Sequence, residues 1–176
     1  MIRPIYTYGD RILRDVAKEI DPTDVQYAEI IEDMFETMHN ANGAGLAAPQ
    51  IGLSIRIVVI EEELPYGELF KGVFINPKII STSEKSNYIQ EGCLSFPGIS
   101  VWVKRPETCI VSWYDQDGKF YEEEFSGIKA RIIQHEIDHL DGGLMIDHMM
   151  IKEKIYVFHS LEEIKSKNII TKYPIK

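Results

Sequence analysis

The segment His135-Glu136-Ile137-Asp138-His139 contains residue types that can bind a metal ion and activate a water molecule. On a helix, two residues four apart lie on one face, about 6 Å apart along the axis, so both imidazoles reach one ion. Glu136 is rotated about 100° around such a helix and can address a water on that ion without becoming a ligand. The spacing therefore indicates metal-dependent hydrolysis. The alternative is an ordinary helix with two solvated histidines.

Catalytic sites of this kind usually combine three protein ligands with one open position, so the third ligand decides the function. Gly142 fits an extended histidine pattern, but Met145 stands where that pattern needs its third histidine, and a thioether suits a hydrolytic ion poorly. Glu162 and Glu163 follow at a distance used by zinc peptidases. Neighbouring lysines favour solvated charges at these two positions.

Cys93 is the third candidate, in a segment whose glycines and proline, Glu91 to Gly98, suit a tight loop. Its thiolate would be a strong soft ligand, although a buried cysteine also packs as a small hydrophobe. Three rival functions therefore stand beside metal hydrolysis at Cys93. They are a closed structural zinc site that adds Cys109, a cysteine hydrolase with Cys93 as nucleophile, and a zinc aminopeptidase that uses Glu162 or Glu163.

The composition of the 176-residue chain fits a single metal-hydrolase domain, 1–176, in which 151–176 form a C-terminal helix and tail. The net charge of −9 argues against nucleic-acid specificity and against an anionic membrane as partner. No apolar run resembles a signal segment or a membrane span, so we expect a cytoplasmic protein. In that reducing compartment the two cysteines are expected to be free or metal-bound.

The hydropathy pattern predicts the elements that must position these residues. We expect an α+β fold, with antiparallel or mixed β-sheets around a central helix that carries the histidine motif, and with an N-terminal and a C-terminal helix. The predicted helices cover 24–40, 127–140 and 152–165, with Thr23 or Asp24 and then Ser126 as N-caps of the first two. The predicted strands are 55–60, 73–75, 79–80, 107–114 and 119–125, the last two forming a hairpin.

Three separated motifs make the chain similar to a known family. Gly43-Ala44-Gly45-Leu46-Ala47-Ala48-Pro49-Gln50 resembles the first motif of peptide deformylases, Glu91-Gly92-Cys93-Leu94-Ser95 the second, and Gln134-His135-Glu136-Ile137-Asp138-His139 the third. These enzymes are metal hydrolases that remove the formyl group from the N-terminal methionine of nascent bacterial-type proteins. The motifs follow the family's order and spacing, and the resemblance extends from Pro4 to about His148.

The resemblance implies a role for several residues of these motifs. The implied metal ligands are Cys93, His135 and His139. Glu136 would act as general base and then as general acid on a water at the fourth position. The Gln50 side-chain amide and the Leu94 backbone N–H would donate hydrogen bonds to the oxygen on which negative charge develops. Arg105 would pair with Glu91 and stiffen the loop that carries Cys93.

The substrate-binding residues implied by the resemblance are Gly43, Ala44, Gly45, Leu46, Glu91, Ile128, Arg131 and Ile132. The glycines let backbone approach the substrate closely. Ile128 and Ile132 can receive a methionine side chain, and core packing is the alternative for each. Ala44 stands where the family often has a larger apolar residue, whereas Trp102 and the acidic segment 61–71 receive no role.

The resemblance implies one divalent metal ion, with Fe²⁺ as the native ion. A thiolate with two imidazoles also accepts Zn²⁺, Ni²⁺ or Co²⁺, so the purified protein is expected to carry any of these. The implied substrates are formyl-methionyl nascent peptides. The resemblance further implies a monomer that acts near the ribosomal exit, with the C-terminal helix as the candidate for docking.

Overall fold

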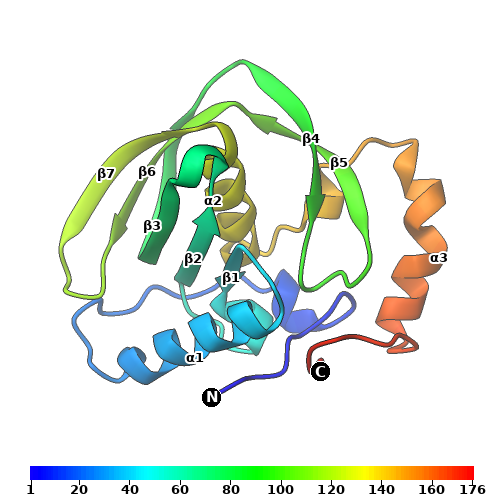
Figure 1. Cartoon of the computed structure of the whole chain (residues 1–176), viewed down its shortest axis with the longest axis horizontal. Helices are drawn as coiled ribbons and strands as arrows, with labels where there is room; N and C mark the ends of the chain where they lie inside the picture. The colour runs from blue at the N-terminus through cyan, green and yellow to red at the C-terminus, as the bar shows by residue number, and fades with distance from the viewer.

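Helix α2, Gly127–Leu140, lies at the centre of the molecule, and the larger β-sheet curves around it in the computed structural model (Figure 1). The structure describes all residues 1–176. Two further α-helices, α1 (Tyr27–Asn40) and α3 (Glu153–Lys165), lie at the periphery. The strands are β1 (Gly45–Ala47), β2 (Ile57–Glu63), β3 (Leu69–Thr82), β4 (Ser86–Gly92), β5 (Ser100–Pro106), β6 (Thr108–Tyr114) and β7 (Phe120–Ser126). The fold is α+β, as the sequence predicts.

Five strands form one antiparallel sheet in the order β1-β2-β3-β6-β7, and β4 and β5 form a separate antiparallel pair. One core lies between α2 and the larger sheet and includes Phe74, Val111 and Ile133. A second core includes Met34 and Met38 of α1. The larger sheet thus packs against one side of α2, and the β4–β5 pair lies beside the helix and contacts Arg131, His135 and Asp138 (Figure 1).

Helix α2 begins directly after β7 because Gly127 adopts a left-handed conformation, φ 58°, that turns the chain out of the strand. Ser126 occupies the predicted N-cap position with extended backbone, but its side chain makes no capping hydrogen bond. The helix ends at Leu140, and Gly142, φ 74°, follows. A Cβ on Gly142 would lie 2.5 Å from the Arg14 carbonyl oxygen, so this end of the helix requires glycine.

Two asparagines with positive φ shape the elements around the site. Asn42, φ 53°, directly precedes Gly43 in the turn after α1. Asn76, φ 51°, precedes Pro77 inside β3, where the register with β6 shifts. The Asn76 side chain accepts a hydrogen bond from the Ile20 N–H at 3.0 Å and donates one to the Ile20 carbonyl at 2.8 Å. The predicted break between 73–75 and 79–80 is therefore wrong, because a bulge absorbs the proline within one strand.

The predicted 107–114 and 119–125 hairpin is confirmed as β6 and β7. The first helix begins at Tyr27 and not at residue 24, because Asp24 instead closes a turn through its side chain and carbonyl. The β4–β5 pair has no counterpart among the predicted strands. In β5 the buried positions are Val101, Val103 and Arg105, and a buried arginine breaks the apolar alternation that identifies a strand.

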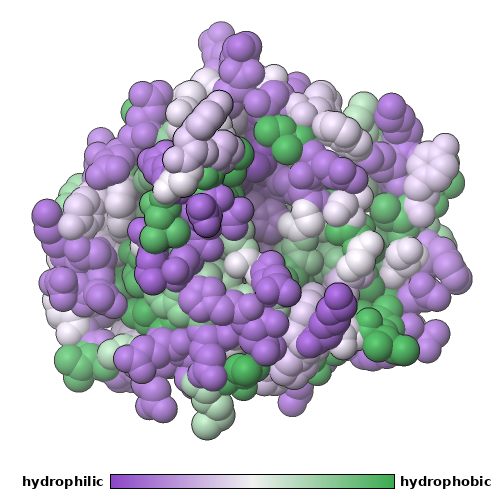
Figure 2. Space-filling view, viewed as in Figure 1, coloured by the Kyte–Doolittle hydropathy of each residue, from purple (hydrophilic) through white to green (hydrophobic).

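The C-terminal helix α3 is exposed over most of its surface. Only Leu161 and Ile164 are buried, whereas the Ile155 and Tyr156 side chains are 82% and 83% exposed. Apolar residues show at the surface over α3, at the right of the space-filling view (Figure 2). None of the helices is both long and apolar enough to cross a membrane. The two chain ends lie close together, with Ile5 and Ile175 forming a parallel β-bridge (Figure 1).

Candidate metal centre

Cys93, His135 and His139 form the group of side chains that can hold a metal ion. Their ligand atoms all lie within 4.8 Å of one another. The Cys93 Sγ is 3.2 Å from the His139 Nε2. Helix α2 supplies both histidines from one face, and the turn after β4 supplies the cysteine. The structure thus brings Cys93 to two histidines that lie more than forty residues further along the sequence.

The chemistry of the three donors fits a divalent cation. The His135 Nδ1 is hydrogen-bonded to Glu91 Oε2 at 2.9 Å, which leaves Nε2 for the ion. Burial lowers the pKa of His139 to about 3, so this imidazole is in the neutral form that ligation needs. One thiolate and two imidazoles complete the three-ligand set of a catalytic site with a fourth position for solvent or substrate.

The donors required by two rival functions lie elsewhere. Cys109 is buried in the core beside β7, and burial raises the pKa of its thiol to about 11, so it is an inert packing residue and not a fourth ligand. Glu162 and Glu163 lie on α3 and do not belong to the Cys93, His135 and His139 group. The Cys93 thiol lies beside His139, as a cysteine hydrolase also requires, but a second imidazole converges on the same point.

Glu136 lies on the face of α2 toward β1, and its side chain is almost fully buried. Burial raises the pKa of Glu136 to about 7, and its Oε2 has no hydrogen-bond partner. A Cβ on Gly45 would lie 2.7 Å from Glu136 Oε1, so only glycine leaves room for this carboxylate. A buried carboxylate with a pKa near neutrality and a vacant oxygen is suited to exchange protons with a reacting water.

The Gln50 side chain is held in one orientation at the site. The residue lies on a 3-10 turn, Ala48–Ile51, that follows β1 directly. Its Oε1 accepts a hydrogen bond from the Ala47 N–H at 2.9 Å. Its Nε2 donates to Ser95 Oγ at 3.1 Å and lies 3.7 Å from Cys93 Sγ. The amide hydrogens therefore face the metal donors.

The turn from Cys93 to Phe96 is fixed by hydrogen bonds to its carbonyl oxygens. The Phe96 N–H donates to the Cys93 carbonyl and the Tyr8 N–H to the Ser95 carbonyl, both at 2.9 Å. The Tyr173 hydroxyl donates to the Leu94 carbonyl at 2.8 Å. The Leu94 N–H itself donates no hydrogen bond within the chain. A free N–H on a fixed turn beside the metal donors can stabilise a developing oxyanion.

Glu91 is the centre of a buried charge network behind the ligands. Its two oxygens accept hydrogen bonds from Arg105 at 2.7 and 3.0 Å, from Arg131 at 2.9 Å and from His135. The structure therefore contains the predicted Arg105–Glu91 ion pair. Burial alone would raise the pKa of Glu91, but hydrogen bonds from His135 and Arg105 outweigh it and hold the pKa far below the usual range.

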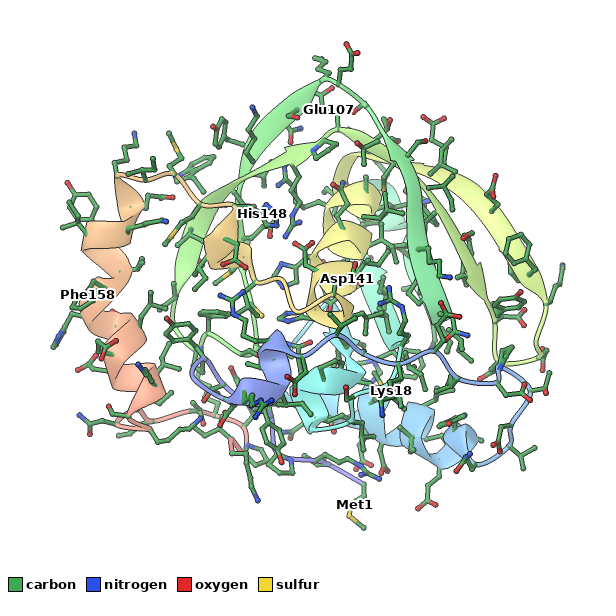
Figure 3. The ribbon with its side chains drawn as sticks, turned by 180° about the vertical axis from the view of Figure 1, so that it is seen from behind. Met1, Lys18, Glu107, Asp141, His148 and Phe158 are labelled. Carbon is green, nitrogen blue, oxygen red and sulfur yellow. The ribbon has the colours of Figure 1, made fainter.

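Asp138 extends this network along α2. It accepts a hydrogen bond from Arg105 at 2.7 Å, and His148 Nε2 lies 3.1 Å from the same oxygen. Seen from behind, His148 lies beside α2, and Asp141 marks the C-terminal end of that helix (Figure 3). Sequence reasoning missed the roles of Ser95, Asp138 and His148. Ser95 and Asp138 lie inside the recognised motifs, so their positions carried a signal, whereas His148 had none.

A cavity of about 520 Å³ opens in front of these donors. The hollow is visible near the centre of the space-filling view (Figure 2). Of the residues that sequence analysis assigned to the site, it is lined by Gly43, Ala44, Gly45, Gln50, Glu91, Cys93, Leu94, Arg131, Ile132, His135 and Glu136. Leu46 and Ile128 do not line it: Leu46 packs in the core with α1, and the Ile128 side chain is 45% exposed. The Arg131 guanidinium donates hydrogen bonds to Glu91, to the Val103 carbonyl and to Asn87.

A central helix with the His-Glu-x-x-His spacing, a thiolate ligand and a buried glutamate at a cavity defines the class of metal-dependent hydrolases. Comparison with known proteins identifies the family within this class. The family model described as polypeptide deformylase matches residues 2–154, and the chain belongs to this family.

Similar proteins extend the match to nearly the whole chain. Peptide deformylases of Chlorobium phaeovibrioides and Chlorobaculum parvum are each 42% identical over 177 residues, which cover 99% of this chain and 93% and 94% of theirs. The crystal structure of an Arabidopsis thaliana peptide deformylase is 38% identical, with a TM-score of 0.86 over 94% of this chain and 91% of the other. A Synechococcus elongatus peptide deformylase in complex with actinonin is 39% identical, with a TM-score of 0.80, over 94% and 85%.

Proposed function

We propose that this chain is a peptide deformylase, a metal-dependent amidohydrolase that removes the formyl group from the N-terminal formyl-methionine of newly made proteins and releases formate. The observation that carries this proposal is the buried Glu136 carboxylate, whose Oε2 has no partner, on the same helix as two histidines that converge with Cys93. Family membership supplies the substrate class.

Cys93, His135 and His139 would hold a divalent ion, which would supply Lewis acidity to a water and to the formyl oxygen. Glu136 accepts a proton from the water while the water oxygen forms a bond to the formyl carbon. As the carbon–nitrogen bond breaks, Glu136 returns that proton to the leaving nitrogen. Formate and a free α-amine result. The raised pKa of Glu136, about 7, lets one carboxylate perform both transfers.

Negative charge develops on the formyl oxygen during attack, and two groups of this chain can donate hydrogen bonds to it. The Gln50 Nε2 is aimed at the site because its Oε1 is held by the Ala47 N–H. The Leu94 N–H has no partner within the chain. Each such donor is worth roughly 3 to 4 kcal/mol in comparable sites. Gly43, Ala44 and Gly45 offer a backbone edge for the peptide, and Ile132 lines the cavity for the methionine side chain.

The native ion is proposed to be Fe²⁺. The soft thiolate and the two imidazoles also suit Zn²⁺, Ni²⁺ and Co²⁺. We expect iron bound by a thiolate to be lost in air, so that aerobically purified protein contains one of the other ions. Metal analysis after anaerobic purification tests this: zinc alone with full turnover would contradict Fe²⁺ as the native ion.

The biological setting is part of the same proposal. Residues 1–176 are proposed to act as one domain in the cytoplasm, as a monomer, on nascent chains near the ribosomal exit. The exposed α3 is the candidate for contact with the ribosome, since its apolar residues Ile155, Tyr156 and Phe158 are exposed. Sedimentation of the protein with and without ribosomes measures both the oligomeric state and this contact.

Formate release from formyl-Met-Ala-Ser tests the function, with the metal content measured in each protein. We expect Glu136→Ala to lose at least about 10²-fold in kcat while it retains one equivalent of metal. Glu162→Ala, an exposed glutamate on α3, is the control and should keep full turnover. Cleavage of unformylated peptide by the wild type, or turnover that survives chelation, would favour a peptidase or a cysteine hydrolase instead.

A further inference from the structure

The C-terminal tail after α3, residues 167–176, returns to the catalytic side of the molecule. It packs against the N-terminal segment 5–10 at both of its ends. Lys167 Nζ donates to Thr7 Oγ1 at 2.6 Å and to Asp10 Oδ2 at 2.7 Å. At the other end, the Ile5 N–H donates to the Pro174 carbonyl and the Lys176 N–H to the Ile5 carbonyl, both at 2.9 Å. The tail is therefore anchored at both ends.

Tyr173 stands between these two anchors and reaches the site. Its side chain lines the same cavity as Glu136 and Leu94. Its hydroxyl donates to the Leu94 carbonyl at 2.8 Å. Burial, reinforced by the charge of Cys93, raises the pKa of Tyr173 to about 12, so the phenol stays a donor over the range in which proteins are stable.

The other restraints on Leu94 act on its side chain and on its neighbours, and not on its own carbonyl. Its side chain packs directly on Gly43, where an added Cβ would lie 2.7 Å from Leu94 Cδ1. Its N–H is free, and the neighbouring carbonyls of Cys93 and Ser95 are each held by a backbone N–H. The Tyr173 hydroxyl is thus the hydrogen bond that fixes the peptide plane after Leu94, one residue from the ligand Cys93.

We propose that Tyr173 is a positioning residue for the oxyanion donor. The Phe96 N–H fixes the peptide plane that carries the Leu94 N–H, through the Cys93 carbonyl, and Tyr173 fixes the following plane through the Leu94 carbonyl, so that the two bonds together hold Leu94 with its free N–H aimed at the reacting oxygen. The inference rests on the proposed function for the identity of that oxygen. It assigns a positioning role to a segment outside residues 2–154, the part of the chain that the family model matches. Tyr173 itself contacts no reacting atom in this proposal.

The geometry predicts a particular kinetic signature. A hydrogen bond to a peptide carbonyl contributes about 0.5–1.5 kcal/mol, which corresponds to a roughly 2- to 12-fold rate effect. Charge develops on the oxygen only in the transition state, so loss of aim at that oxygen should lower kcat and leave KM nearly unchanged. A tyrosine that merely bound substrate would change KM, and one that merely stabilised the fold would change neither in the folded protein.

The test compares Tyr173→Phe with Tyr156→Phe, a control on the exposed face of α3 where the hydroxyl donates no hydrogen bond to another residue. We expect kcat with formyl-Met-Ala-Ser to fall about 3- to 10-fold in Tyr173→Phe, with KM within twofold of the wild type and metal content unchanged. The control should match the wild type. A kcat that falls less than twofold, or a loss confined to KM, would overturn the proposal.

A second measurement does not depend on turnover. Hydrogen–deuterium exchange of the 93–96 turn should be faster in Tyr173→Phe than in the wild type and in Tyr156→Phe, with no change in the strands of the larger sheet. Unchanged exchange in this turn would overturn the inference. If the wild type itself releases no formate, the proposed function fails, while the exchange measurement still decides whether the tail holds the turn.

Discussion

The polar groups behind the metal ligands are hydrogen-bonded, whereas two of those on the cavity side have no partner. Behind the ligands, both oxygens of Glu91 are occupied by Arg105, Arg131 and His135. In front of them, Glu136 Oε2 and the Leu94 N–H have no partner within the chain. A buried polar group without a partner costs about 1–3 kcal/mol. Glu136 is almost fully buried, so the fold accepts a loss of stability at this carboxylate, whereas the network around Glu91 fixes the geometry of the ligands from behind.

The largest effect is expected from a substitution in the charge network behind the metal ligands. Glu91→Gln leaves two buried arginines without their shared carboxylate, so we expect the free energy of unfolding to fall by about 3–5 kcal/mol. Metal affinity should fall about 10- to 100-fold because His135 loses the partner that orients it. Urea unfolding and competition with a chelator measure the two quantities. Glu122→Gln, an exposed carboxylate on β7, is the control. A destabilisation no larger than that of the control would show that the network is dispensable.

The two carboxylates should also respond to pH with opposite sign. The pKa of Glu136 is raised to about 7 from its ordinary 4.5, so the folded protein holds this proton more tightly than the unfolded chain. Its contribution to stability is fully present below pH 4.5 and is lost as the pH rises to 7. The pKa of Glu91 is lowered, so its contribution is present above its ordinary pKa of 4.5 and is lost as the pH falls.

The contribution of Glu136 to the pH dependence of stability can be measured on the metal-free protein. Glu136→Gln removes the titration, so its free energy of unfolding should exceed that of the wild type by at most about 3 kcal/mol at pH 8 and by nothing at pH 4. Urea unfolding at both pH values gives the two differences. A variant that is equally stabilised at both values would contradict a raised pKa for Glu136.

A smaller effect on turnover is expected when a methyl group is added next to Glu136 on the cavity side of the ligands. Gly45→Ala places a methyl group 2.7 Å from Glu136 Oε1, so the carboxylate must shift. We expect kcat to fall about 10-fold, since small misplacements of a catalytic group are costly, while the melting temperature changes little. Steady-state kinetics and a thermal melt separate the two. Full turnover in this variant would mean that the position of Glu136 is not critical.

The smallest effect distinguishes the two isoleucines assigned to the methionine pocket. Ile132 lines the cavity, whereas Ile128 lies outside it with an exposed side chain. Ile132→Ala should raise KM for formyl-Met-Ala-Ser several-fold, because about 1 to 2 kcal/mol of apolar contact is removed. Ile128→Ala should stay within twofold of the wild type. The reverse order of the two KM values would place the methionine side chain on the Ile128 side.

The sequence was most informative where one helix carries the chemistry. The spacing of His135 and His139 predicts α2, its ligand face and the place of Glu136, because helical periodicity is local. The residues alone made Cys93 one of three candidates for the third ligand, and the resemblance selected it; the structure brings it to the two histidines. The predicted partner of Glu91, Arg105, is also found in contact with it.

What the sequence did not reveal depends on contacts between distant segments. The β4–β5 pair was missed because its inward residues include the charged Arg105, which is buried only because Glu91 lies opposite. Arg131 lines the cavity, but its guanidinium is bound to Glu91 and to the Val103 carbonyl, and the sequence did not reveal these contacts. The hydrogen bond from Tyr173 to Leu94 spans 79 residues, and no local pattern predicts such a contact.

The turn after α1 has a consequence for the lifetime of the protein. Deamidation of asparagine proceeds when the next backbone nitrogen attacks the side-chain amide, and it is fastest before glycine. Asn76 is protected, because Pro77 has no N–H to attack with. Asn42 is exposed and precedes Gly43 at the rim of the cavity. Deamidation of a stored preparation should therefore begin at the rim of the cavity, where each event adds a negative charge.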